Sequence, residues 1–372
     1  MDVIQQLIQQ LEAESGFAVS ANDPTLQFEI DGQELLFSSL LPERTVEKNE
    51  YRDFGVKFKT MIANDGTRYS PPQKKGGMMM SSVMVELGNS DTSTEMNQQQ
   101  YEHFIRFLDR GITQQAVFAL LRFFESGVSR PLALLRERHR VEAIVKGYVH
   151  RRGANNFEEV VRLSNPPGHR VTVPSGTATA PTGWYDPDYS ILTDLKAKKL
   201  MLQRKGYRVT RIITTSDLIA DTMVKNNEIR LYGISSVQTS AGVVTLPVLS
   251  ENQALLNAFA AAQLPNPETY EQGYSDQEGY HLYMKDCLIM VCSTGRSQEI
   301  KLGDESPIVI PDTIGYYGVG TATGQLSPGV ATKVESFDGK DARIEAMGWQ
   351  TSFPVIQEPE AFMVFNIPKP TA

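Results

Sequence analysis

The chain has 372 residues, of which 41% are apolar and 22% are charged. These are the values of an ordinary globular protein, and they exclude a disordered or collagen-like chain. The formal net charge of −8 opposes tight binding of the whole chain to nucleic acid, because phosphate contacts need a surplus of Lys and Arg.

The length allows two compact domains, or one large body with extensions. The first residues contain no basic segment followed by a long apolar run. No stretch approaches the roughly 20 apolar residues that a membrane span needs. We therefore expect neither secretion nor a membrane partner.

The first 45 residues predict a short amphipathic helix over 3–14, followed by an extended arm. The end of this arm is strongly apolar and carries Leu35, Leu36, Phe37, Leu40 and Leu41. So much apolar surface must be covered, and we expect neighbouring copies of the chain to cover it.

Two runs of alternating residues follow, from Tyr51 to Phe58 and from Val83 to Leu87, and they predict two strands. A connection of about twenty residues joins them, and loops of such length without a helix are usually functional. Its turn-rich tip carries Lys74 and Lys75. We interpret 42–90 as a long hairpin that projects from the body.

Helical periodicity begins near Phe104, resumes over 116–124, and continues from Ser129 in a third, long helix that we expect to end near Gly153. Basic residues line one side of the third helix: Arg136, Arg138, Arg140 and Lys146. We expect this side to be solvated, and contact with an anion or a partner stays as the alternative. Glu142 and Lys146 are expected to form a surface pair at i,i+4 spacing.

A mixed α/β region is predicted next. Residues 160–173 predict a pair of strands, and 174–183 a loop. Asp186 and Pro187 suit the start of a helix over 189–205. A strand over 209–214 and helices over 216–226 and 250–262 follow.

The last third of the chain is predicted to be mainly strands. His281–Met284 and Cys287–Cys292 predict a hairpin with its corner at Lys285 and Asp286, and 316–329 predicts a glycine-rich loop. Long strands are expected over 330–367. Cys287 and Cys292 match neither a zinc nor a redox spacing, so buried thiols are expected.

No catalytic, cofactor-binding or metal-binding residue is predicted. The five histidines show no metal-ligand spacing. Gly318–Gly324 resembles a dinucleotide loop in its letters, but it leads to a strand where such a loop opens a helix. Asp186 and Asp188 suit either a helix cap or a divalent cation. An α/β enzyme that uses the residues around Asp186 and Gly318–Gly324 stays open as a hypothesis.

The order of elements and three local features carry a resemblance. The features are the helix from Arg136 to His150 ending at Gly153, Trp184 with Asp186-Pro187, and Phe353-Pro354-Val355-Ile356 with Pro359 and Ala361. With them the chain resembles tailed-bacteriophage major capsid proteins of the Hong Kong 97 fold, specifically the lambda-like capsid protein E group.

The resemblance implies an α+β fold with an N-terminal arm, an extended β-hairpin loop, a peripheral domain and an axial α/β domain. The ranges are 1–45 for the arm, 46–99 for the extended loop, 100–187 for the peripheral domain with a spine helix over 130–152, and 188–325 for the axial domain. Residues 326–372 would return to the peripheral domain as C-terminal strands.

The implied function is structural and not enzymatic. Such a chain assembles into pentamers and hexamers of an icosahedral head, in the host cytoplasm, and the virion capsid encloses double-stranded DNA without binding it specifically. Scaffold, portal and cement proteins would be its partners. Some members of the family join Lys and Asn side chains, but Lys74 and Lys75 have no matching partners here and are expected to be solubilising. The alternative is an encapsulin-type compartment shell.

Overall fold

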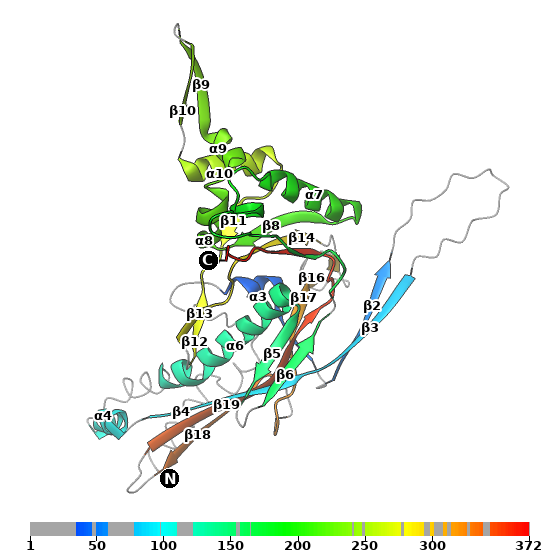
Figure 1. Cartoon of the computed structure of the whole chain (residues 1–372). Helices are drawn as coiled ribbons and strands as arrows, with labels where there is room; N and C mark the ends of the chain where they lie inside the picture. Colours follow the sequence, from blue (N-terminus) through cyan, green and yellow to red (C-terminus); the bar gives the residue numbers. More distant parts are fainter. Residues whose placement is uncertain are drawn as a thin grey trace, which may run out of the picture. The chain divides into compact units, whose positions relative to one another are not determined.

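The computed structural model divides into two compact units (Figure 1). The first contains the described residues within 43–133 and 317–357, and the second those within 29–42, 134–316 and 358–372. The structure describes residues 35–46, 50–58, 78–96, 98–109, 122–153, 157–163, 165–239, 242–247, 250–276, 279–293, 298–300, 308–310, 314–325, 328–337 and 343–371. The predicted helix over 3–14 and the tip with Lys74 and Lys75 lie outside them.

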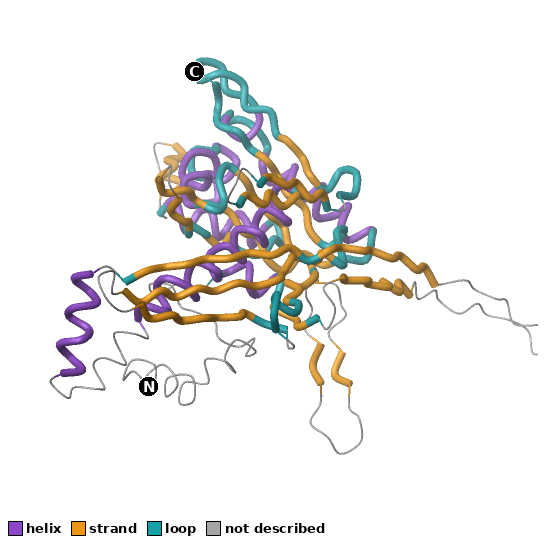
Figure 2. Tube along the Cα trace, turned by 90° about the horizontal axis from the view of Figure 1, so that it is seen from below, coloured by secondary structure: helices purple, strands orange, loops and turns teal. Residues whose placement is uncertain are grey.

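The first unit is built on one long strand, β19 (Arg343–Ile356). Strands β18 (Val330–Phe337) and β4 (Gly88–Glu95) pair with it in antiparallel fashion. Figure 2 shows these three strands side by side. β17 (Gly315–Val319) also joins β19, and β1 (Glu43–Thr45) lies parallel to β17. The predicted strands at 330–367 are therefore confirmed.

A helical segment covers part of this sheet. It runs through Arg122–Phe124, η1 (Glu125–Ser129) and α6 (Arg130–Val141), while α4 (Gln98–Asp109) precedes it. Phe124, Val128 and Leu132 recur at helical spacing and pack on Ala346 of β19. The period of the apolar residues therefore decides which side of the helix is buried.

The hairpin predicted after the arm is present as two strands, β2 (Glu50–Phe58) and β3 (Met78–Glu86). They pair in antiparallel register along their whole length, from Glu50 opposite Glu86 to Phe58 opposite Met78. Within the described residues, neither strand joins a larger sheet.

The second unit contains a mixed sheet in the order β11 (Pro267–Thr269), β8 (Arg208–Thr214), β14 (Cys287–Ser293), β20 (Phe362–Asn366) and β7 (Arg170–Thr172). Every residue of β14 from Cys287 to Cys292 is buried, as expected for a central strand covered on both faces. Leu288, Met290 and Cys292 belong to the main core.

Helices α7 (Ile191–Arg204) and α10 (Glu251–Ala261) lie on the same side of this sheet in Figure 1. The core also includes Trp184 from the short helix η3 (Gly183–Tyr185). Other short helices are α3 (Leu36–Leu40), η2 (Glu142–Lys146), α8 (Ser216–Leu218), η4 (Ile219–Met223), α9 (Asn227–Arg230) and η5 (Leu231–Gly233). The helices predicted at 189–205 and 250–262 are confirmed.

Four further hairpins belong to the second unit, and each forms a two-stranded sheet of its own. They are β5 (Tyr148–Arg152) with β6 (Glu158–Arg162), β9 (Ile234–Thr239) with β10 (Gly242–Pro247), β12 (Gly273–Asp276) with β13 (Gly279–Leu282), and β15 (Gln298–Ile300) with β16 (Ile308–Ile310).

The long helix ends earlier than the sequence predicts. It continues from α6 through η2 only to Lys146, and residues 148–152 form β5. Gly147 stops the helix at a φ of 75°, a left-handed conformation that favours glycine. The predicted end near Gly153, and with it the span 130–152 for a single helix, is wrong.

Two predicted strand pairings are also wrong. β6 (Glu158–Arg162) and β7 overlap the pair expected at 160–173, but β6 pairs with β5 and β7 with β20. β13 pairs with β12, and β14 pairs with β8 and β20, so no hairpin turns at Lys285 and Asp286. Alternation of residues predicts a strand, but it carries no information on which strand will be its neighbour.

Candidate functional site

Asp186 and Asp188 form a local turn and not the start of a helix. The Asp186 Oδ1 accepts a hydrogen bond from the Asp188 backbone N–H at 3.0 Å, and α7 begins only at Ile191 after Ser190. The Asp188 carboxylate accepts from Asn227 Nδ2 at 2.8 Å. The interpretation of Asp186 as a helix cap is therefore wrong. In the described part of the chain, no three His, Cys, Asp or Glu side chains lie close enough to hold a metal ion.

The glycine tract Gly318–Gly324 also differs from its predicted form. Gly318 lies in β17, whose five residues are all buried, so the beginning of the predicted loop is a strand. It faces Arg44 of β1 in parallel register. A buried strand cannot present its backbone N–H groups to a phosphate, because the sheet uses them.

Cys287 and Cys292 are both buried and unpaired with each other. Burial raises the pKa of each thiol to about 12. Since the thiolate is the reactive form, both cysteines are inert at neutral pH.

Among the residues that the structure describes, buried charged groups gather on the long helix, within the second unit. Arg140, expected on a solvated face, is only 2% exposed. Its Nε donates to the Leu41 carbonyl at 3.0 Å, and its Nη1 lies 3.4 Å from Glu137 Oε2. The prediction of a solvated basic side is therefore wrong at Arg140.

Glu137 is fully buried and binds two further donors. Its Oε1 accepts from the Phe37 backbone N–H at 2.9 Å and from the Tyr270 hydroxyl at 2.8 Å. Burial raises the pKa of Glu137, and the charge of Arg140 and these hydrogen bonds act against that rise. We call Phe37, Leu41, Glu137, Arg140 and Tyr270 the α3 clamp.

The clamp fixes the apolar end of the predicted arm inside its own chain. Phe37 packs edge-on against Tyr270 with 5.3 Å between ring centroids. Leu35, Phe37, Leu40 and Leu41 are all buried. The expectation that neighbouring copies must cover these residues is wrong, because the second unit covers them.

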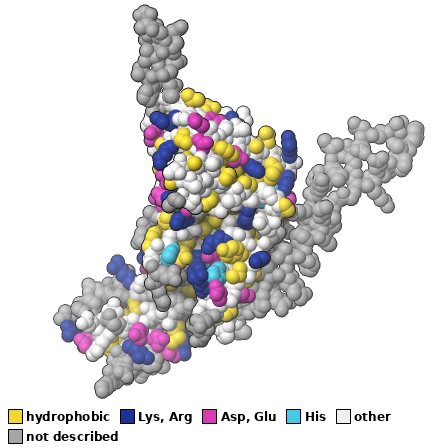
Figure 3. Space-filling model, in the orientation of Figure 1, with side chains coloured by type: hydrophobic (Ala, Val, Ile, Leu, Met, Phe, Trp, Pro, Cys, Tyr) yellow, Lys and Arg dark blue, Asp and Glu magenta, His cyan; other side chains and the backbone are white. Residues whose placement is uncertain are grey.

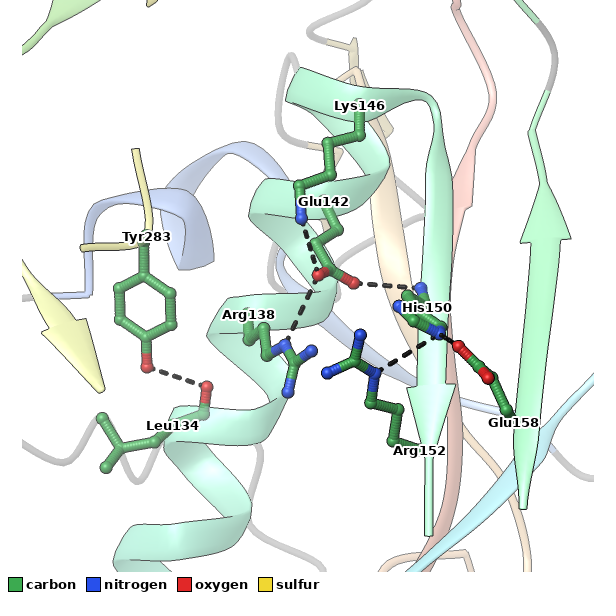
Figure 4. Close-up of polar contacts among 8 residues, drawn as sticks. All are labelled: Leu134, Arg138, Glu142, Lys146, His150, Arg152, Glu158 and Tyr283. Atoms are coloured by element: carbon green, nitrogen blue, oxygen red, sulfur yellow. Dashed lines mark hydrogen bonds and ion pairs between the residues drawn. The ribbon is translucent and has the colours of Figure 1, made fainter. Parts of the chain in front are cut away.

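A second buried carboxylate, Glu142, follows Glu137 five residues later on the same helix, and Figure 4 shows its contacts. Its Oε1 accepts from Lys146 Nζ at 3.0 Å and Arg138 Nε at 3.4 Å, and its Oε2 accepts from the His150 backbone N–H at 3.0 Å. Burial by itself would raise the pKa of Glu142, but the three donors outweigh it and the pKa is lowered. The predicted surface pair with Lys146 therefore has a buried member.

These contacts join separate elements to one helix. Glu142 holds the middle of β5 through the His150 backbone N–H, and the Tyr283 hydroxyl donates to the Leu134 carbonyl at 2.9 Å (Figure 4). Glu137 and Glu142 both accept from groups of the protein itself, so neither is offered to a substrate. The arrangement is suited to fastening segments together. The i,i+3 spacing of Glu137 and Arg140 is the one sequence signal that could have revealed it.

The chain was compared with known proteins by sequence and by three-dimensional structure, and only the structures gave matches. No family model matches the chain, and no curated protein is similar to it in sequence. Among solved structures, a capsid protein of an Escherichia coli prophage is 12% identical with a TM-score of 0.48. The match covers 90% of this chain and 93% of the prophage protein.

The chain is similar to phage capsid proteins of known structure. A phage-related protein from Bordetella bronchiseptica is 11% identical with a TM-score of 0.49, and the match covers 92% of this chain and 96% of that one. An encapsulin complex from Synechococcus elongatus is 10% identical with a TM-score of 0.41, and the match covers 93% of this chain and 91% of that one.

None of the helices that the structure describes is long and apolar enough to cross a membrane.

Proposed function

We propose that the chain is a structural shell subunit, the major capsid protein of a tailed bacteriophage with the Hong Kong 97 fold. It would assemble into pentamers and hexamers of an icosahedral head and catalyse no reaction. The proposal includes the ranges given above for the arm, extended loop, peripheral domain, axial domain and C-terminal strands, with the spine helix ending at Lys146.

One observation carries this proposal. Among the described residues, five hairpins form two-stranded sheets that join neither of the two larger sheets. A two-stranded hairpin by itself is marginally stable in water, and its edges present unpaired backbone groups. A chain with so many exposed edges is suited to contacts between copies, where heterologous contacts close into rings.

The distribution of charge supports a shell that encloses DNA without binding it specifically. On the face drawn in Figure 3, acidic and basic side chains of the described residues are interspersed, and they form no large patch of a single charge. With a net charge of −8, the chain offers little attraction to phosphate. We therefore propose that the virion capsid surrounds double-stranded DNA while scaffold, portal and cement proteins serve as protein partners.

Electron microscopy of the purified full-length chain, with sedimentation of the same sample, tests the proposal. Closed particles built of five-fold and six-fold rings are the expected result. A chain that stays monomeric under all assembly conditions would contradict it. The encapsulin alternative predicts particles that form without a scaffold or portal protein, and neighbouring genes for those two proteins would argue against it.

A further inference from the structure

The β5–β6 hairpin has one edge that carries a self-complementary pattern. Strand β6 (Glu158–Arg162) pairs with β5 in a regular antiparallel register, from Arg152 opposite Glu158 to Tyr148 opposite Arg162. Within the described residues, β6 has no neighbour on its other side. Its residues are exposed apart from Val161, which is half-buried.

The hydrogen bonds of the hairpin decide which backbone groups face outward. Gly153 N–H donates to the Phe157 carbonyl at 3.0 Å, and Leu163 N–H donates to the Gly147 carbonyl at 2.9 Å. Bonded and non-bonded pairs alternate along an antiparallel ladder, so the backbone groups of Glu158, Val160 and Arg162 point away from β5. The open edge therefore offers three consecutive bonding positions.

The apolar side chains on this edge are unusually accessible. Phe157 is 48% exposed and Val160 is 51% exposed. Edge strands are commonly protected by short length, by charged side chains, by proline or by a bulge. β6 is short and carries charges of both signs, which the pairing proposed below uses. β6 contains no proline, and its register shows no bulge.

We propose that β6 pairs antiparallel with β6 of a second copy, about a two-fold axis through Val160. In that register, Glu158 of each copy faces Arg162 of the other, and Phe157 faces Leu163. The three outward-facing positions form bonded pairs, each of which exchanges two backbone hydrogen bonds. Opposite charges directly across a ladder are favourable.

Other registers lose this complementarity. Moving the axis to Glu159 places the two copies of Glu159 opposite each other, and like charges across a ladder are unfavourable. Moving it to Val161 places Arg162 opposite Val160 and leaves Glu158 without a charged partner. Within the hairpin, Glu158 Oε1 lies 2.6 Å from His150 Nε2, which holds the carboxylate on the Val160 face of the strand (Figure 4).

The contact rests on the proposed shell function for its place in an assembly, because copies in a closed shell meet across two-fold axes. The pairing itself depends only on the residues and backbone groups of β6. The shell function and the β6–β6 pairing can therefore be disproved separately.

A single cysteine on the axis tests the pairing directly. A bonded antiparallel pair places its two Cα atoms about 5.5 Å apart, within the reach of a disulfide. The full-length Val160→Cys variant is oxidised mildly, both as particles and as unassembled subunits, and analysed on a non-reducing gel. The matched control is Arg152→Cys, on the same face of β5 but about 20 Å from its counterpart, three strand spacings across and four residues along the strands.

We expect the Val160→Cys variant to give at least about tenfold more covalent dimer than the Arg152→Cys control. Equal yields from the two variants, or a cross-link from Val160→Cys to a different protein of the particle, would overturn the pairing. If the chain forms no particles, the proposed function fails, and the yield from unassembled subunits decides the pairing. If particles form and Val160→Cys stays monomeric, only the pairing fails.

Charge reversal gives an independent test. Glu158→Arg or Arg162→Glu alone places like charges opposite each other twice at each two-fold axis, and we expect dimerisation to weaken roughly tenfold. The double variant Glu158→Arg/Arg162→Glu restores opposite charges and should recover most of the loss. Its failure to do so, with both single variants folded by circular dichroism, would contradict the register. Glu159→Gln on the opposite face is the control.

Discussion

At the residue scale, Glu137 and Arg140 form an ion pair that is almost entirely removed from water. Removing one member of a buried pair leaves an uncompensated charge or a set of orphaned donors. Glu137 also accepts hydrogen bonds from the Phe37 backbone N–H and the Tyr270 hydroxyl. Its removal would therefore leave these two donors without an acceptor.

We therefore expect Glu137→Leu or Arg140→Met alone to lower the free energy of unfolding by about 3–5 kcal/mol. The double variant should cost clearly less than the sum of the two, because the paired charges leave together. Urea titration of the four proteins measures this coupling. Strictly additive losses would show that the two side chains act independently.

His139, between the two carboxylates on the same helix, makes stability depend on pH. It is buried, and burial lowers its pKa to about 4, while Glu142 acts in the opposite direction. A depressed pKa means that its stabilising contribution is complete above the unfolded-state pKa of 6.5 and is lost as the pH falls toward 4.

This residue should account for a loss of up to about 3 kcal/mol between those two pH values. Burial lowers the pKa of His169 as well, so His169 adds a loss of the same sign. The variant His139→Gln cannot be protonated and should show a shallower decline in unfolding free energy over that range. Chemical denaturation at several pH values compares the two proteins. Equal slopes would mean that His139 is not the group responsible.

At the element scale, the long helix lies very close to β19. A Cβ on Gly348 would collide with the Val128 side chain, and a Cβ on Gly127 would collide with Thr94. Two glycines thus permit the helix and sheet to approach each other. Gly318 in the same sheet is different, since its Cβ would meet its nearest neighbours at 3.5 Å, an ordinary contact distance.

We expect Gly348→Ala to destabilise the first unit by about 1–3 kcal/mol, the usual cost of overpacking a close contact. Gly318→Ala serves as the matched control and should cost less than Gly348→Ala. Thermal unfolding of both variants measures the difference. Similar losses in the two would place the cause in strand conformation and not in helix packing.

At the scale of the whole molecule, the position of α3 decides how much of the N-terminal region can be removed. Residues 35–41 complete the second unit through the α3 clamp. A deletion of residues 2–34 leaves that clamp intact, whereas a deletion of residues 2–40 exposes its core and removes the Phe37 donor.

The shorter deletion should therefore give a folded chain that fails to assemble, if the part of the proposed arm before Leu35 makes the contact between subunits. The longer deletion should also lower the unfolding temperature. Calorimetry and electron microscopy of both truncated proteins separate the two effects. Normal particles from the shorter deletion would refute the role of the arm, and equal unfolding temperatures would contradict the role of the clamp.

The sequence determined the elements whose signal is local. The apolar spacing in α7 and α10, the alternation in β2, β3 and β19, and the buried apolar run of β14 all depend on residues close together in the chain. The absence of any motif with its required context also followed from the sequence, because such motifs need particular residues at fixed spacing.

Only the tertiary structure decided the partners. Which strands pair with β7 and β13, which segment covers Leu35–Leu41, and which charges are buried depend on residues brought together from distant parts of the chain. Arg140 resembles any exposed helical arginine until Leu41 and Glu137 surround it. Local pattern specifies how a segment folds, but burial is set by what the rest of the chain places against it.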